Sequence, residues 1–158
     1  MDAMLKAFDR SFAEIDTRSR KLMLGISDDL LFAKPRKTGN SMAMFSCGEY
    51  TLRSAAMVEK TFGGITTRLW DDPFEWTLPE KLGDVAAVLT YLDEVESTRR
   101  KGFAFFASDA DLERELPAPE KQRSIFDILL ETVALAEHYQ GRAFAVFQML
   151  SDAKLPRR

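Results

Sequence analysis

The stretch SIFDILLETVALAEHYQGRAFAVFQML, residues 124–150, decides the fold that this sequence predicts. Its apolar side chains recur at intervals of three, four or seven residues, which is the spacing of one face of an α-helix. Ser124, with Asp127 three residues further on, has the polar pattern that is typical of a helix start. We therefore predict a helix of about 27 residues with an apolar face.

Three stretches upstream show the same helical spacing. The first covers about 5–27. The second, about 46–62, begins at the capping-box sequence Ser46-Cys47-Gly48-Glu49, and we expect Gly63-Gly64 to end or bend it. The third begins at Thr77-Leu78-Pro79-Glu80 and continues to about 107. No stretch alternates convincingly in the manner of a β-strand.

These four amphipathic stretches predict one all-α domain over residues 1–158. An antiparallel four-helix bundle is the simplest arrangement that buries four apolar faces. The stretch ITTRLWDDPFEWTLPE, 65–80, predicts a long aromatic loop between the second and third helices. Its Trp70 and Trp76 either cover the open end of the bundle or form a docking surface for a partner.

Composition excludes several classes of function. The net charge of −3 argues against a nucleic-acid partner, because phosphate contacts require clustered Lys and Arg. The charged amino-terminal segment predicts no signal peptide, and no apolar run approaches the ~18 residues of a transmembrane helix. Cys47 is the one cysteine and forms no disulfide within the chain, which fits a reducing compartment. We expect a cytoplasmic protein with no membrane partner.

No cofactor is predicted, and the usual metal sites are excluded by counting. Zinc takes three or four ligands from His, Cys and carboxylates, whereas this chain has one His and one Cys. Sites of two or three histidines, of four cysteines or of paired Glu-x-x-His motifs are therefore excluded within one chain. A site built from His138 and carboxylates stays open. The sequence also lacks a glycine-rich phosphate loop and a nucleotide fingerprint.

Two titratable residues are candidates for catalysis. Glu59 shares a predicted helix face with Phe45 and Leu52, where an unpaired carboxylate is costly. It is either a pocket acid or base with a raised pKa, or a structural acid that joins helices through a backbone, Arg or Tyr partner. His138 lies on the shoulder of the last apolar face. It is either a hydrogen-bonded structural residue or a general acid–base that titrates near neutral pH.

Two segments resemble the DinB/YfiT-like superfamily of metal-dependent helical-bundle proteins. Ser46-Cys47-Gly48-Glu49, with Arg53 and Glu59 downstream, is similar to the second helix of that family. The run LLETVALAEHYQGRAFAVFQML, 129–150, resembles its last helix, and Gly141 supplies the register. The resemblance implies the family's bundle fold and a tendency to form homodimers through helix faces.

The resemblance also places the family's metal ligands on residues that are not histidines. In the family register, its three ligand histidines fall on Arg53, Leu135 and Tyr139. His138 matches a family histidine that neighbours a ligand. The resemblance therefore implies a bundle whose metal site has lost all three of its usual ligands.

We expect a metal-free bundle protein that binds a small molecule between its helices. The expected pocket residues are Glu49, Arg53, Glu131, Leu135, His138 and Tyr139. One alternative is a hydrolase or a thiol-dependent transferase of the family's type, with His138 as acid–base and Glu59 or Glu131 as its partner. Another is a dimeric interaction module that docks through the Trp70–Trp76 loop. The sequence leaves open whether the protein is an enzyme.

Overall fold

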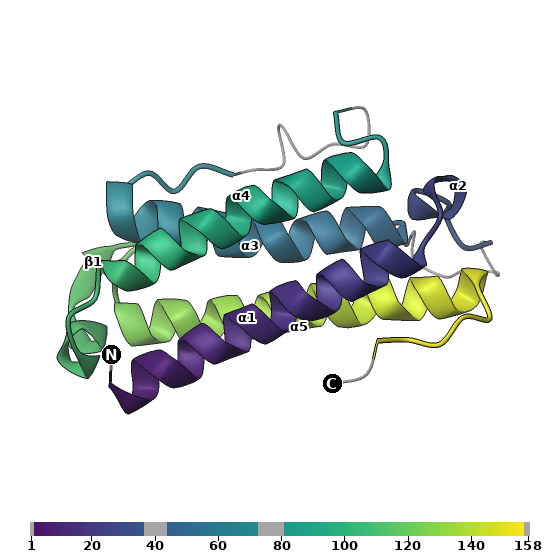
Figure 1. Ribbon diagram of the computed structural model, residues 1–158. Coiled ribbons are helices and arrows are strands. Elements are labelled where there is room, and N and C mark those ends of the chain that lie inside the picture. The colour runs from purple at the N-terminus through teal and green to yellow at the C-terminus, as the bar shows by residue number, and fades with distance from the viewer. Residues whose placement is uncertain (1, 37–43, 73–80, 157–158) are drawn as a thin grey trace.

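The computed structural model describes residues 2–36, 44–72 and 81–156, which are mainly helical (Figure 1). The long helices of these residues are α1 (Ala3–Gly25), α3 (Cys47–Thr67), α4 (Val85–Ala104) and α5 (Ile125–Leu150). The short elements are α2 (Asp28–Leu31), the 3-10 turn η2 (Asp109–Glu113) and the strands β1 (Glu115–Pro117) and β2 (Gln122–Ser124). None of these helices has the length and apolarity needed to cross a membrane. The predicted all-α class is confirmed.

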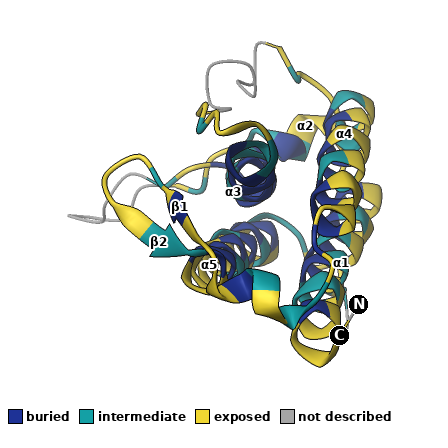
Figure 2. Cartoon of the chain, turned by 90° about the vertical axis from the view of Figure 1, so that its left-hand side faces the viewer, coloured by how far each residue is buried: buried dark blue, intermediate teal, exposed yellow. Residues whose placement is uncertain are grey.

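The four long helices lie side by side, and each packs against two others. Helix α3 contacts α4 and α5, and α1 contacts the same two helices from the other side (Figure 2). Helices α1 and α5 run in one direction, whereas α3 and α4 run in the opposite direction (Figure 1). The pairs α1–α4 and α3–α5 are therefore antiparallel, and the pairs α3–α4 and α1–α5 are parallel. Two consecutive parallel helices require a long connection, which accounts for the loop predicted between them.

The apolar faces meet in one core that is rich in phenylalanine. The rings of Phe12 and Phe62 pack edge to face at 5.3 Å, and Phe103 lies 5.1 Å from Phe62. Phe62 of α3 presses directly against the backbone of α4 at Gly102. A Cβ atom added at Gly102 would lie only 2.2 Å from that ring. The glycine therefore sets the distance between α3 and α4.

Two of the predicted helix starts are confirmed by their caps. The Ser46 hydroxyl accepts the N–H of Glu49 at 3.1 Å, and the Glu49 carboxylate accepts the N–H of Ser46 at 2.7 Å. This reciprocal pair begins α3 as the capping-box pattern predicts. At the start of α5, the Ser124 hydroxyl accepts the N–H of Asp127 at 3.1 Å. Both starts depend on side chains within four residues of the helix, which is why the sequence reveals them.

Of the two alternatives predicted for Gly63-Gly64, an end or a bend of the helix, the end is wrong. The helix continues to Thr67 and ends where Arg68 adopts the left-handed conformation, with φ of 65°. The physical reason lies in the tertiary packing, because a Cβ atom at Gly64 would come within 2.2 Å of the Trp70 ring. Gly64 is thus a helical residue that makes room for a tryptophan.

The predicted start of α4 is also wrong, and a hairpin was missed. Residues 77–80, the predicted cap, lie outside the described residues, and α4 begins only at Val85, where Asp84 accepts the N–H of Ala87 at 2.7 Å. It ends at Ala104, three residues before the predicted end. The connection before α5 contains the antiparallel β1–β2 hairpin, although the sequence shows no convincing strand. Strands of three residues are too short to display an alternating pattern.

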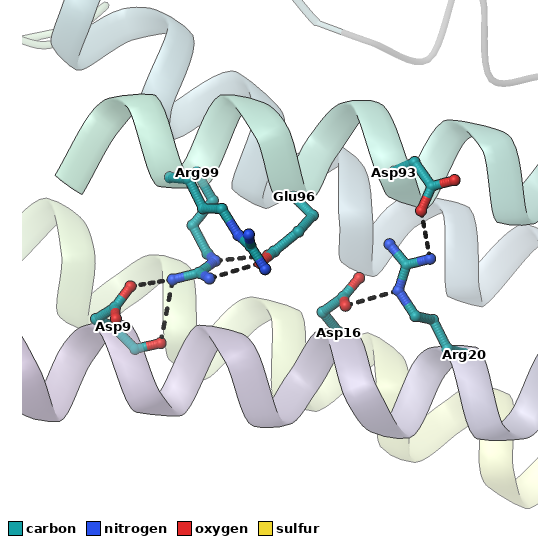
Figure 3. Close-up of polar contacts among 7 residues, drawn as sticks. Asp9, Asp16, Arg20, Asp93, Glu96 and Arg99 are labelled. Carbon is teal, nitrogen blue, oxygen red and sulfur yellow. Dashed lines mark hydrogen bonds and ion pairs between the residues drawn. The ribbon is translucent and has the colours of Figure 1, made fainter. Parts of the chain in front are cut away.

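Charged side chains join α1 to α4 on the side of the molecule away from the hairpin (Figure 3). Arg99 of α4, only 5% exposed, donates two hydrogen bonds of 2.7 Å to Glu96 and reaches Asp9 of α1. Further along the two helices, Arg20 of α1 bonds Asp16 at 2.7 Å and Asp93 of α4 at 2.6 Å. A buried arginine is tolerated only when it is paired in this way. The network therefore fixes how α1 lies against α4.

Two acids of this network have shifted pKa values of opposite sign. Burial raises the pKa of Glu96, but the hydrogen bonds and charges of Arg99 and Arg100 outweigh it, and the pKa is lowered overall. Burial also raises the pKa of Asp16, and Arg20 offsets only part of that increase. Ionised Glu96 therefore stabilises the fold above its ordinary pKa of 4.5, whereas the contribution of Asp16 is lost as the pH rises through its raised pKa.

We predict that Glu96→Gln lowers the free energy of unfolding at pH 7 by about 1 to 3 kcal/mol, because Arg99 loses one of its two charged partners and keeps Asp9. The difference from the wild type should shrink as the pH falls from about 4.5 through the lowered pKa of Glu96, below which the carboxylate of the folded wild type is protonated too. Urea unfolding at a series of pH values measures this. Asp93→Asn, at an exposed end of the network, is the control and should change stability by less than about 0.5 kcal/mol. A pH-independent loss for Glu96→Gln would contradict the assignment.

The glycine contact between α3 and α4 gives a second prediction. Gly102→Ala should destabilise the protein by about 1 to 3 kcal/mol, because the new methyl group collides with the Phe62 ring. Gly141→Ala is the matched control: its Cβ meets nothing within 4 Å, and the gain in helix propensity should stabilise the protein by up to about 1 kcal/mol. Urea unfolding of both variants is the measurement, and equal effects would mean that Phe62 does not pack on Gly102.

Candidate functional site

A cavity of about 340 Å³ lies beside the seam between α3 and α5. Its walls come from the second half of α3, the first half of α5, Trp70 and the turn of the β1–β2 hairpin. Figure 2 shows the hairpin beside these two helices, on the side away from α1 and α4. The volume is typical of a site for a small organic molecule. We take this α3–α5 cavity as the candidate site.

Trp70 forms a wall of the cavity and is held from two directions. Its ring packs on α3 at Gly64. Its indole N–H donates to the carbonyl oxygen of Pro117 in β1 at 3.1 Å. The tryptophan thus joins the end of α3 to the hairpin, and the N–H of Ile125 ties the hairpin to α5 through the carbonyl of Arg114 at 2.9 Å. For Trp70, the structure favours the covering role over an exposed docking role, while Trp76 lies outside the described residues.

Two buried threonines form the innermost polar part of the cavity. The hydroxyl oxygens of Thr61 on α3 and Thr132 on α5 lie 2.7 Å apart, and Thr132 also donates to the carbonyl of Ile128 at 2.7 Å. Each hydroxyl has one proton to donate. With the Thr132 proton on Ile128, the Thr61 proton goes to Thr132. In that arrangement the pair presents oxygen lone pairs to the cavity, where they accept hydrogen bonds.

The cavity lining contains more positively charged than negatively charged side chains. Arg123 binds the carboxylate of Glu131, and this ion pair lies between the cavity and a shallower groove along the hairpin. The remaining charges of the lining belong to Lys60, Lys121 and Glu120. With Arg123 neutralised by Glu131, the two lysines against one glutamate leave the cavity with a net positive charge.

The structure brings two of the six expected pocket residues to this cavity. Glu131 and Leu135 line it. Glu49 instead caps α3 and lies 3.9 Å from Lys34, while the Arg53 guanidinium packs over the Phe45 ring at 4.0 Å from its centroid. His138 and Tyr139 are outside the lining, and their rings contact each other edge to face at 5.6 Å.

The expected pocket is displaced because α3 and α5 pack closely beside it. The Ser54 hydroxyl donates to the carbonyl of Ala136 at 2.8 Å, and both residues are fully buried. The seam opens only further along, around Thr61 and Thr132. The part of the chain that the structure describes has no group of three or more His, Cys, Asp or Glu side chains placed to hold a metal ion. This includes the site of His138 and carboxylates that the sequence leaves open.

The two candidate catalytic residues lie apart from each other. Glu59 accepts a hydrogen bond from the buried Tyr91 of α4, which matches the structural alternative of an acid that joins two helices. Burial and the Glu59 carboxylate both raise the pKa of Tyr91, so the phenol stays protonated and donates. His138 is exposed on α5. Its two proposed acid partners are engaged elsewhere, since Glu59 binds Tyr91 and Glu131 binds Arg123.

Cys47 is not a reactive thiol. It is fully buried in the core, and burial raises its pKa to about 12. Only a thiolate is a good nucleophile, and this thiol is protonated near neutral pH. Any chemistry with a low-molecular-weight thiol would therefore proceed without Cys47.

Sequence reasoning missed Lys60, Thr61, Lys121, Arg123 and Thr132 as site residues. The threonines carry a weak signal, since each falls on the apolar face of its helix. The hairpin residues carry none, because their place beside α3 depends on the contact between Trp70 and Pro117. That contact joins residues 47 positions apart.

We predict that Tyr91→Phe lowers the free energy of unfolding by about 1 to 2 kcal/mol, because it removes a hydrogen bond to a carboxylate between α3 and α4. Tyr139→Phe is the matched control. The Tyr139 side chain packs against the His138 ring, and loss of its hydroxyl should change stability by less than about 0.5 kcal/mol. Urea unfolding measures both variants. An equal change in their free energies of unfolding would contradict the structural role assigned to Glu59.

Comparison with known proteins yields no match, whether with protein-family models, curated proteins or solved structures. None of these comparisons bears on the expected DinB/YfiT-like family.

Proposed function

We propose that this protein is a metal-free four-helix bundle of the DinB/YfiT-like type that binds a small organic molecule in the α3–α5 cavity. The observation that carries the proposal is the cavity itself, with a fixed aromatic wall at Trp70 and a polar floor at Thr61 and Thr132. Apolar walls with a few placed polar groups are the usual composition of a small-molecule site. The contacts of α3 with α4 and α5, and of α1 with the same two helices, support the bundle arrangement.

The metal-free part of the proposal rests on the residues at the three family ligand positions. Arg53 brings a positive charge, Leu135 an alkyl group and Tyr139 a phenol. None of these is a usual ligand for zinc, and the guanidinium repels a cation. Leu135 instead lines the cavity, where an apolar wall suits an organic ligand.

An enzymatic role for His138 has less support. A general acid–base needs a substrate site within hydrogen-bond reach, whereas His138 lies outside the cavity lining. Its ring contacts Tyr139. A hydrolase or thiol-dependent transferase that uses His138 would need a different site from the α3–α5 cavity.

The proposal is tested with N-phenyl-1-naphthylamine, a neutral probe whose fluorescence rises in apolar cavities. We predict saturable binding to the wild type and a loss of at least about tenfold in affinity for Leu135→Arg, which puts a bulky charge in the wall. Leu24→Arg is the control, because Leu24 is an exposed leucine of α1 far from the cavity. It should bind as the wild type does.

Elemental analysis of the same untagged, dialysed protein checks the metal-free part. We expect no stoichiometric zinc, nickel or iron. Stoichiometric metal would overturn that part. Equal probe binding by both leucine variants would overturn the assignment of the cavity.

A further inference from the structure

The chemistry of the α3–α5 cavity indicates which class of molecule it accepts. Its apolar wall is made by Met57, Trp70, Ile128 and Leu135. These side chains offer a ligand no hydrogen bonds, since the indole N–H of Trp70 is already bonded to Pro117. A ligand must therefore present an apolar body to this wall, because a polar body would lose its hydrogen bonds to water without replacement.

The floor of the cavity rejects an acidic group. Thr61 and Thr132 are 6% and 4% exposed, and their two protons are used within the threonine pair and on Ile128. With the Thr132 proton on Ile128, the floor offers oxygen lone pairs. A carboxylate placed there would face other acceptors and no donor, which is unfavourable in a buried position. An N–H or O–H group of a ligand would be accepted at the same place.

The solvent side of the cavity attracts an acidic group. Lys121 is exposed and Lys60 half-buried, and both line the cavity. Lysine side chains of this kind keep the charged ammonium group in water while the stem covers apolar surface. Arg123 is occupied by Glu131, and Glu120 is a single acid beside two lysines. The positive charge at the rim and the hydrogen-bond acceptors at the floor therefore favour different groups of a ligand at the two ends of the cavity.

We propose that the α3–α5 cavity binds a small amphipathic organic anion, with its aromatic or alkyl body against Trp70 and Leu135 and its acidic group at Lys60 and Lys121. This inference rests on the proposed function, since it names the ligand class of the same cavity. Beyond the proposed function, the inference states that the ligand is negatively charged and that its apolar body enters the cavity first.

A matched pair of probes separates the two proposals. 8-Anilinonaphthalene-1-sulfonate carries the anilinonaphthalene body of N-phenyl-1-naphthylamine together with one sulfonate. We expect the wild type to bind the sulfonate probe about three- to tenfold more tightly than the neutral probe, and this preference should weaken at high salt. Dissociation constants are measured by fluorescence titration on folded protein, with folding checked by urea unfolding.

The double variant Lys60→Gln, Lys121→Gln should lose the preference for the sulfonate while binding the neutral probe within about twofold of the wild type. Lys21→Gln, Lys101→Gln is the matched control: it removes two exposed lysines from α1 and α4 and should keep the preference.

Equal binding of both probes by the wild type, or an equal loss of preference in the two double variants, would overturn the anion proposal and leave the proposed function standing. Failure of both probes to bind would overturn the proposed function.

Discussion

Helices α3 and α5 approach closely because small side chains line their seam, and the other helices are positioned on this pair. The buried hydroxyl of Ser54 bonds directly to the backbone of α5 at Ala136, which requires that no larger side chain lie between the two helices. From α5, the buried Gln140 donates to α1 at the carbonyl of Ile15 and at the Ser19 hydroxyl, both at 2.7 Å. From α3, Glu59 accepts the hydroxyl of Tyr91 on α4.

The same seam explains why the cavity lies where it does. Close contact at Ser54 leaves no room for a ligand in the part of the seam where the sequence predicted a pocket. Further along, the chain after α3 turns back at Arg68, and Trp70 packs on Gly64. The hairpin completes the enclosure. The molecule thus separates its roles: ion pairs hold α1 to α4 (Figure 3), while the opposite side keeps a cavity that is open to solvent next to α3 and α5.

The parts of this structure that the sequence predicts are those that depend on near neighbours. The caps at Ser46 and Ser124 follow from side chains three residues away, and the helical faces follow from local spacing. The end of α3 was not predictable in this way, because Gly64 has the composition of a helix end and its role is set by Trp70. For the cavity, helical spacing identified Glu131 and Leu135. Lys121 could not be predicted as a cavity residue, because its position depends on tertiary contacts of the hairpin.

The parallel pairing of α1 with α5 has a consequence for how the protein is made. The contact between Ser19 and Gln140 joins residues 121 positions apart, so it forms only after most of the chain has been synthesised. At roughly 5 to 20 residues per second, α1 and α3 wait for several seconds on the ribosome before α5 exists to cover them. During that interval their apolar faces are available to chaperones and to other nascent chains. Among the long helices that the structure describes, α5 is the one whose synthesis makes these contacts possible.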